Sequence, residues 1–228
     1  DANNQVIRHI TEEGGEPVLT DLMDFFLYCL LDPVYLWRHM GGKAFPAFSN
    51  WLLIKRIESL RDAMRRALEG SRFLPVSRIA DLARSVRGIV STGNQAGEGW
   101  LLTAEMLELI DHGVGNVLCL QPFGCLPNHI TGKGVLKELK RIRPHANLMA
   151  VDYDPGSSEA NQLNRIKLFM TVAHSRIPQE AQGDHAPASL NESVAQLAGR
   201  LRDNLKGKLE NTIGGSGNSR DEVTNLAR

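Results

Sequence analysis

The sequence predicts an α/β fold: a doubly wound, mostly parallel sheet of the Rossmann or flavodoxin type, with a helical extension at the C-terminus. Three short apolar segments between residues 88 and 152 alternate with helical patterns, which is typical of β-α-β units. A helical region precedes them, and a long apolar stripe at helical spacing follows. With 228 residues, of which 42% are hydrophobic, the chain has room for one domain with a smaller appendage.

The N-terminal region is predicted to form helices separated by short breaks. Apolar residues at helical spacing indicate a first helix, which Gly14 and Gly15 end. Asp21 caps a second, strongly apolar helix, and Pro33 breaks or kinks it. A third helix carries apolar residues on one side and basic residues on the other. We expect these helices at 4–13, 21–31 and 51–68, with an extended segment at 16–20 and a loop at 41–50.

Three β-α units follow. Each consists of a short apolar strand, a loop rich in polar, Gly and Pro residues, and a helix. In an open α/β sheet the loops after parallel strands lie at one edge, where ligands bind. The expected strands cover 88–91, 116–120 and 147–152, and the expected helices end near residues 112, 141 and 173.

The last part of the chain has a different composition. The sequence predicts an α/β domain over residues 1–177, and over 178–228 a polar linker, a long amphipathic helix and a flexible tail. The apolar stripe of this helix has near-heptad spacing, so the helix packs on its own domain or pairs with another chain. The stripe consists of Leu190, Val194, Leu197, Leu201, Leu205 and Leu209.

Charge and hydropathy exclude several classes of protein. Lys and Arg together number 26, as do Asp and Glu, which argues against a protein that binds nucleic acid or coats an anionic membrane. The longest apolar run, at 25–31, is far shorter than the roughly 20 residues that cross a bilayer, and no signal peptide opens the chain. Three cysteines do not suit a disulfide scaffold and favour the cytoplasm. Because the chain begins at Asp1 within a helical pattern, we expect a piece of a longer polypeptide.

The loop after the second expected strand is the most specific candidate site. It covers residues 121–129, and its glycine and two prolines restrict the backbone. Cys125 in this loop is a buried small residue, a nucleophile with His129 as its base, or an iron ligand. Cys119, within the strand, and Cys29, on an apolar helix face, favour core packing. No complete Walker A, GxSxG, HExxH, GxGxxG or CxxC motif occurs, and the cysteine spacing does not suit structural zinc.

The other two loops contribute polar side chains to the same expected crevice. Asn94, Gln95 and Glu98 lie in the loop after the first expected strand. Asp152 ends the third expected strand, and Asp154 lies in the turn that follows it. These aspartates bind a cation or a ribose hydroxyl, or they organise the Asp-Pro-Gly turn.

These three loops resemble one family, the large activase-related proteins of the 2-hydroxyacyl-CoA dehydratase system, known as CoA-substrate-specific enzyme activases. The resemblance is to their C-terminal region; it covers residues 3–175, with the dense motifs confined to 88–172. The matching strings are NQAGEGW at 94–100, QPFGCLPNH at 121–129 with GKG at 132–134, and DYDPG at 152–156 followed by SEANQLNR at 158–165.

The resemblance implies a function. Members of this family join ATP-binding activase domains of the actin and hexokinase type to a region similar to the dehydratase or double-cubane cluster subunits. Activases hold a [4Fe–4S] cluster and use ATP hydrolysis to drive a low-potential electron into a partner cluster. The chain resembles the dehydratase-like region and lacks the ATPase domain, so we expect the isolated chain to be inactive.

The resemblance also implies roles for single residues. Cys125 is the implied cluster ligand and Cys119 a weaker candidate, while Asn128 and His129 tune the site through hydrogen bonds. The family's other cluster cysteines fall upstream of Asp1, so we expect the isolated chain to lack a cluster or to hold iron poorly.

The expected partners are other domains of the same longer chain, a dehydratase, or a second copy in a homodimer. As an alternative to a module of the electron-transfer activase, the chain is a docking or oligomerisation domain without catalytic activity.

Overall fold

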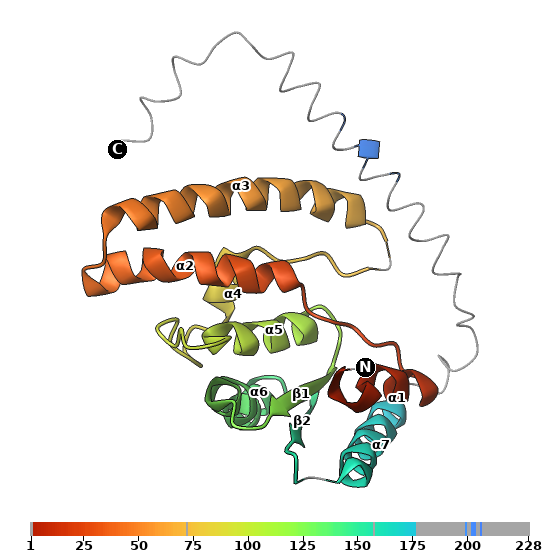
Figure 1. Cartoon of the computed structure of the whole chain (residues 1–228). Coiled ribbons are helices and arrows are strands. Elements are labelled where there is room, and N and C mark those ends of the chain that lie inside the picture. Colours follow the sequence, from red (N-terminus) through yellow and green to blue (C-terminus); the bar gives the residue numbers. More distant parts are fainter. Residues whose placement is uncertain are drawn as a thin grey trace. The chain divides into compact units, whose positions relative to one another are not determined.

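The computed structural model describes residues 2–71, 73–156 and 158–176, together with the isolated positions 199, 202, 203 and 206. This part of the chain is mostly helical and contains one two-stranded parallel sheet (Figure 1). The prediction of a doubly wound α/β fold is therefore wrong. The predicted linker, amphipathic helix and tail at 178–228 lie outside the described residues, apart from those four positions.

The chain divides into two compact units. The first comprises residues 1–55 and 77–184, and the second comprises 56–76 and 185–228. No helix among the described residues is long and apolar enough to cross a membrane. The elements are η1 (Ala2–Gln5), α1 (Val6–Glu12), α2 (Leu22–Met40), α3 (Ala44–Leu68), α4 (Ile79–Ser85), α5 (Gly99–Asp111), β1 (Asn116–Pro122), the π-helical turn η2 (Asn128–Gly132), η3 (Lys133–Val135), α6 (Leu136–Ile142), β2 (Asn147–Tyr153) and α7 (Glu159–Ser175).

The two strands of the sheet pair in parallel and in register, so that Cys119 lies opposite Ala150 and Gln121 opposite Asp152. Side chains alternate along β1 because successive residues of a strand point to opposite faces. Val117, Cys119 and Gln121 are buried on one face. The sheet thus presents these three side chains to the same side, where the candidate site lies.

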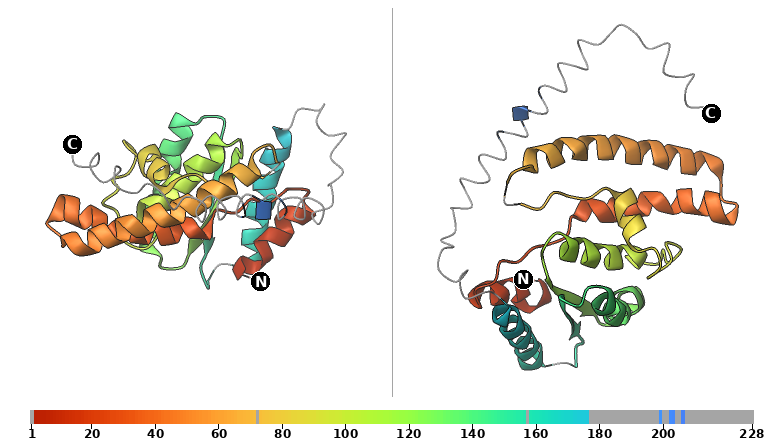
Figure 2. Two further views of the ribbon diagram at one scale, coloured as in Figure 1. Left: turned by 90° about the horizontal axis from the view of Figure 1, so that it is seen from above. Right: turned by 180° about the vertical axis from the view of Figure 1, so that it is seen from behind.

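The other face of the sheet packs on the core of the first unit. Ile166, Phe169 and Met170 of α7 form a cluster with Val6 of α1, and Leu118 of β1 packs against it. Helices α1 and α7 lie side by side in every view (Figures 1 and 2). Removing these apolar side chains from water stabilises the sheet although it has only two strands.

The segment expected to form the first strand, 88–91, is a turn. The amides of Ile89 and Val90 both donate to the carbonyl of Val86, which extends the end of α4, and Gly88 has a φ of 84°. A positive φ suits glycine and does not occur in regular strands. The local turn bonds therefore replace the sheet bonds on which the doubly wound prediction depended.

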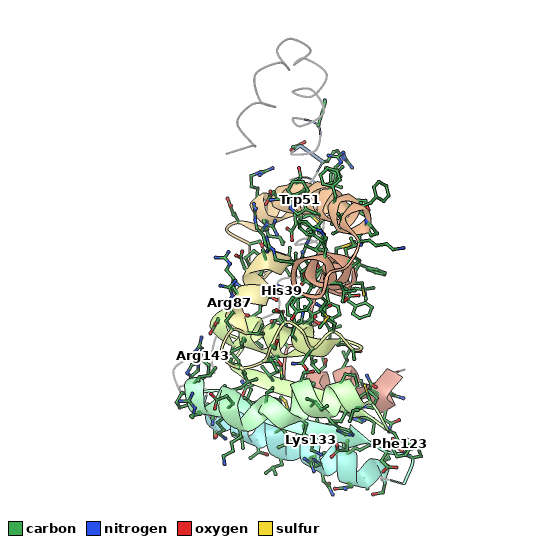
Figure 3. All side chains as sticks on the ribbon, turned by 90° about the vertical axis from the view of Figure 1, so that its left-hand side faces the viewer. His39, Trp51, Arg87, Phe123, Lys133 and Arg143 are labelled. Carbon is green, nitrogen blue, oxygen red and sulfur yellow. The ribbon has the colours of Figure 1, made fainter. Side chains whose placement is uncertain are left out.

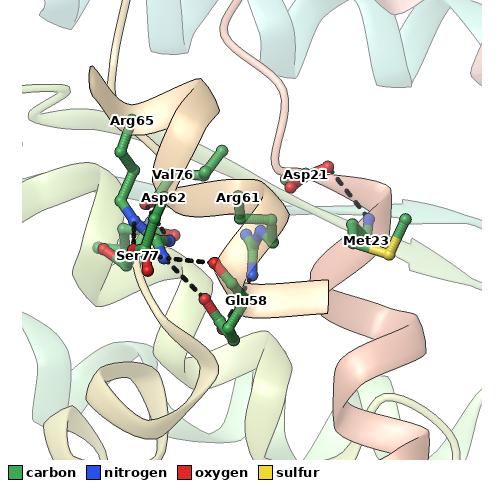
Figure 4. Close-up of polar contacts among 9 residues, drawn as sticks. Asp21, Met23, Glu58, Arg61, Asp62, Arg65, Val76 and Ser77 are labelled. Carbon is green, nitrogen blue, oxygen red and sulfur yellow. Dashed lines mark hydrogen bonds and ion pairs between the residues drawn. The ribbon is translucent and has the colours of Figure 1, made fainter. Parts of the chain in front are cut away.

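Helix α2 runs further than expected. Asp21 caps it as predicted, because its side chain accepts a hydrogen bond from the amide of Met23 at 3.1 Å (Figure 4). Pro33 does not end the helix, which continues to Met40. Gly41, in the left-handed region, is its C-cap. The loop expected at 41–50 is also wrong, since α3 begins at Ala44.

The second unit contains the end of α3 and the segment that follows it. Arg65 donates to a carboxylate oxygen of Glu58 at 2.8 Å and to Asp62 at 2.7 Å, and it also donates to the carbonyl of Val76 at 3.2 Å (Figure 4). The guanidinium group of Arg65 therefore links two turns of α3 to the segment that follows this helix.

Candidate functional site

The three loops that resemble the activase-related family contact one another in the first unit. A Cβ atom on Gly97 would lie 3.0 Å from the ring of Pro127, so the first loop touches the second. Lys133, in the turn after η2, forms an ion pair of 2.9 Å with Asp152 at the end of β2. The first loop follows a turn and not a strand, so it does not lie at the end of a sheet strand as expected.

The loop from 121 to 129 is held by its own backbone. Gly124 adopts a φ of 68°, and the amide of Cys125 donates to the carbonyl of Pro122 at 3.2 Å. The amide of His129 donates to the carbonyl of Cys125 at 3.1 Å. These bonds lead directly into the π-helical turn η2, a conformation that is frequent at functional sites.

Beneath this loop lies a buried polar cluster formed by Cys119, Gln121 and Asn128. The side-chain nitrogen of Gln121 donates to Asn128 Oδ1 at 2.6 Å and to Cys119 Sγ at 3.0 Å. All three side chains are less than a tenth exposed. Gly132 closes the cluster, because a Cβ atom there would lie 2.9 Å from both Cys119 Sγ and Asn128 Oδ1. The cluster ties β1 to η2.

Cys119 is a packed thiol within this cluster. Burial raises the pKa of Cys119 to about 11, although the hydrogen bond from Gln121 lowers it in part. The thiol is therefore a poor nucleophile at neutral pH. Its burial and the hydrogen bond from Gln121 fit the core-packing interpretation.

Cys125 has a different environment. It is partly exposed, and the apolar neighbours Phe123, Leu126 and Ile130 are 69%, 65% and 52% exposed. Phe123 projects outward at the end of the molecule that also carries Lys133 (Figure 3). His129 is exposed, and its only hydrogen bond to Cys125 among the described residues is between backbone atoms. The arrangement gives an accessible thiol framed by apolar side chains, without a base bound to it.

The side chains of the first loop mainly stabilise that loop. Asn94 and Gln95 donate to the carbonyls of Ser91 and Thr92 at 3.1 and 2.9 Å. Glu98 caps α5 without a side-chain cap bond. A Cβ atom on Gly99 would lie 1.9 Å from the carbonyl oxygen of Asn94, so only glycine allows the loop to close here.

The two aspartates of the third loop have separate roles. Asp152 forms the ion pair with Lys133, while Asp154 accepts a hydrogen bond from the amide of Gly156 at 2.8 Å. The second bond is an Asx turn, so Asp154 organises the Asp-Pro-Gly turn as one of the two expectations had it. Gln162 of α7 donates to the carbonyl of Asp152 at 3.3 Å and holds the loop from below.

A partly buried carboxyl group lies elsewhere in the same unit. Burial raises the pKa of Glu105 on α5 to about 8, with a further contribution from the nearby charge of Asp24, and a hydrogen bond with Thr20 partly opposes this. Asp24 itself is 1% exposed. The sequence analysis assigned no role to Glu105.

The donor set does not fit a complete iron–sulfur site. Within the described ranges, no group of three or more His, Cys, Asp or Glu side chains is close enough to hold a metal ion. A cluster needs three or four thiolates or their equivalents. Of the two cysteines near the site, Cys119 is buried and protonated, which leaves Cys125 as the one accessible thiol of this loop.

Gln121 and Gly132 are site residues that the motif analysis did not single out. Both lie in the sequence strings that carry the family resemblance, but neither residue was assigned a role. The alternation of Val117, Cys119 and Gln121 along β1 could have identified Gln121 as an inward-facing amide. No pattern within the sequence predicts that Gly132 touches Cys119, because this contact depends on the π-helical turn.

Comparison with known proteins adds no assignment: no family model matches the chain, and neither curated proteins nor solved structures contain a match.

Proposed function

We propose that this chain is a docking module of an iron–sulfur electron-transfer protein related to the activases of the 2-hydroxyacyl-CoA dehydratase system. In this proposal the loop around Cys125 contacts the cluster-bearing dehydratase component. One observation carries the proposal: the three loops that resemble the family pack together at one end of β1 and β2, although α5 and α6 separate them in the sequence.

The surface around Cys125 suits a protein partner. Phe123, Leu126 and Ile130 expose more than half of their surface, and residues 121–130 contain no Asp, Glu, Lys or Arg. Apolar side chains that gather on a surface loop often mark a binding site. The backbone bonds of the loop and the buried cluster beneath it fix these side chains in advance, which lowers the entropic cost of binding.

We favour a docking role over electron transfer that would use only the residues of this chain. The described residues offer one accessible thiol in the loop and no third ligand. No electron-transfer step is therefore assigned to these residues, and ATP binding belongs to domains that the family resemblance places outside this chain.

A second candidate function rests on Cys125 itself. In this alternative the thiolate of Cys125 is one ligand of a [4Fe–4S] cluster, and the other ligands come from another part of the longer protein. The partial exposure of Cys125 on a backbone-fixed loop favours this alternative, and Asn128 and His129 are the neighbours that would orient the site.

Anaerobic reconstitution of the longer protein with iron and sulfide, followed by visible absorption and EPR, separates the two candidates, because the second takes its other ligands from outside this chain. The docking proposal expects Cys125→Ser to leave the cluster of the longer protein unchanged. A stoichiometric cluster that disappears in Cys125→Ser but persists in Cys119→Ser and Cys29→Ser would support the second candidate and contradict the first.

Binding to a purified iron–sulfur dehydratase component tests docking directly. Sedimentation velocity should show a complex with the native chain. The double variant Phe123→Ser/Leu126→Ser should weaken it at least about tenfold, because buried apolar anchors dominate interfaces. Phe45→Ser/Leu168→Ser removes two equally exposed apolar side chains elsewhere and is the matched control. Equal binding by both double variants would contradict the proposal.

A further inference from the structure

A cavity lies in the first unit, away from the loop around Cys125. Its volume is about 390 Å³, which lies within the range of small-molecule sites. Helix α2, the end of α4 and the turn at 88–95 form its walls, and Trp100 at the start of α5 closes it. The docking proposal does not use this cavity.

The mouth of the cavity is cationic. Arg38 and His39 of α2 and Arg87 after α4 line it, and the lining contains neither Asp nor Glu. Among the described residues no ion pair involves Arg38 or Arg87, whereas Arg84, one turn before Arg87, pairs with Asp81. His39 and Arg87, both labelled in Figure 3, are among the residues that line the cavity. Two guanidinium groups that lack a carboxylate partner form a suitable site for an oxyanion.

Two residues beside the cavity each carry a buried polar atom without a hydrogen-bond partner among the described residues. Trp100 is 1% exposed, and its Nε1 donor makes no hydrogen bond; the side-chain oxygen of Gln95 is also buried without one. Both residues line the cavity. Burying a polar group without a hydrogen bond is costly, so such groups are rare in folded proteins unless a ligand or water satisfies them.

The remaining walls are apolar or aromatic. Leu31, Val34 and Val90 line the cavity, and the ring of Tyr35 lies 4.6 Å from that of His39, measured between centroids. These groups suit the apolar part of a small ligand. The cavity therefore combines basic side chains with mostly apolar walls.

We propose that this cavity binds a small organic phosphate, with the phosphate group at Arg38, His39 and Arg87 and its ring against the apolar walls. A dianionic phosphate matches two guanidinium groups and an imidazole better than a single carboxylate does. Trp100 lines the cavity and therefore serves as a reporter of binding.

Indole NMR of the ¹⁵N-tryptophan-labelled chain tests the proposal, with phenyl phosphate as the probe. The chain has three tryptophans. Trp37 and Trp51 are exposed, so the variant Trp37→Phe/Trp51→Phe identifies the Trp100 signal without disturbing the core. Phenyl phosphate should shift this signal in a saturable way, inorganic phosphate should compete with it, and phenol alone should not produce the shift.

Charge variants complete the test. Arg38→Gln/Arg87→Gln should raise the dissociation constant at least about tenfold. Arg8→Gln/Arg141→Gln removes the same net charge from exposed sites outside the cavity and should leave it unchanged. An unmoved Trp100 signal, an equal shift with phenol, or equal weakening by both double variants would overturn the proposal. None of these results depends on Cys125 or on a protein partner, so failure here is distinct from failure of the docking proposal.

Discussion

Lys133 and Asp152 form an ion pair of 2.9 Å that joins the turn after η2 to the end of β2. These residues come from two of the three loops of the candidate site, so the pair fixes the spacing between them. Both side chains are more than a third exposed, and water therefore screens the attraction.

Breaking this ion pair should change stability only slightly. Lys133→Met and Asp152→Asn should each lower the free energy of unfolding by about 1 kcal/mol or less, because exposed ion pairs contribute little. Urea unfolding of both single variants and the double variant measures the coupling energy. A coupling energy above about 2 kcal/mol would mean that the pair is far less exposed than the structure indicates.

Gly132→Ala should be strongly destabilising. The added Cβ would lie 2.8 Å from a methyl group of Leu102 and 2.9 Å from Cys119 Sγ and Asn128 Oδ1, so the buried cluster must move. We expect a loss of about 2 kcal/mol in the free energy of unfolding. Gly115→Ala is the matched control, because a Cβ there meets no atom within 4 Å. Equal stability of the two variants in urea would show that the cluster is loosely packed.

The three cysteines should react at different rates with iodoacetamide. Cys119 is buried and its pKa is raised to about 11, whereas Cys125 is partly exposed. Cys29 is exposed, so the expectation that it packs in the core is wrong. Because the thiolate is the reactive form, mass spectrometry of the native chain at neutral pH should find Cys29 and Cys125 labelled and Cys119 unlabelled. Labelling in denaturant is the control and should reach all three. Native labelling of Cys119 at the rate of Cys125 would contradict the packed-thiol interpretation.

Glu105 should make the protein less stable as the pH rises. Its pKa is raised from 4.5 to about 8, so the folded state holds a proton that the unfolded state has already lost in this range. The stability that this proton maintains is complete below the unfolded pKa, and it decreases as the pH rises towards the folded pKa. Since one pKa unit corresponds to about 1.4 kcal/mol, the decrease between the unfolded and the folded pKa is on the order of 5 kcal/mol.

Thermal unfolding between about pH 5 and about pH 8 measures this dependence. The variant Glu105→Gln should flatten the profile, because the amide does not titrate. Glu13→Gln, at an exposed site, serves as the control and should keep the native slope. A steep profile that persists in Glu105→Gln would place its origin in another group.

The elements that the sequence predicted well are those with strong local signals. Asp21 is a capping residue before an apolar run, and the structure uses it as the cap of α2. The apolar runs at 116–120 and 147–152 form β1 and β2, since valine and leucine pack well on a pleated surface.

The errors arose where two local signals competed. At 88–91 the apolar residues Ile89 and Val90 favoured a strand, but their amides bond to Val86, and the turn continues from α4. At Pro33 the ring removes one backbone donor, yet α2 continues to Met40; Leu27 and Tyr28, before the proline, are buried, whereas Trp37 and Met40, after it, are exposed. Neither outcome follows from propensity alone.

The sequence placed Cys119 in a strand, where it favoured core packing, and Cys125 in the loop that follows. It could not show that the Cys119 thiol accepts a hydrogen bond from Gln121 or that Cys125 is partly exposed. Burial of a strand residue depends on which face the neighbouring helices cover, and that is a property of tertiary packing.

At the π-helical turn Asn128–Gly132, the number of residues matters as well as their identity. Its exposed residues, such as His129 and Ile130, have room for other side chains. Loss of a single residue here would restore regular α-helical winding and rotate everything that follows by about 100°. Lys133 would then turn away from Asp152, and Gly132 would leave the one position where it fits against Cys119. The loop should consequently accept many exchanges on its outer side and no deletion.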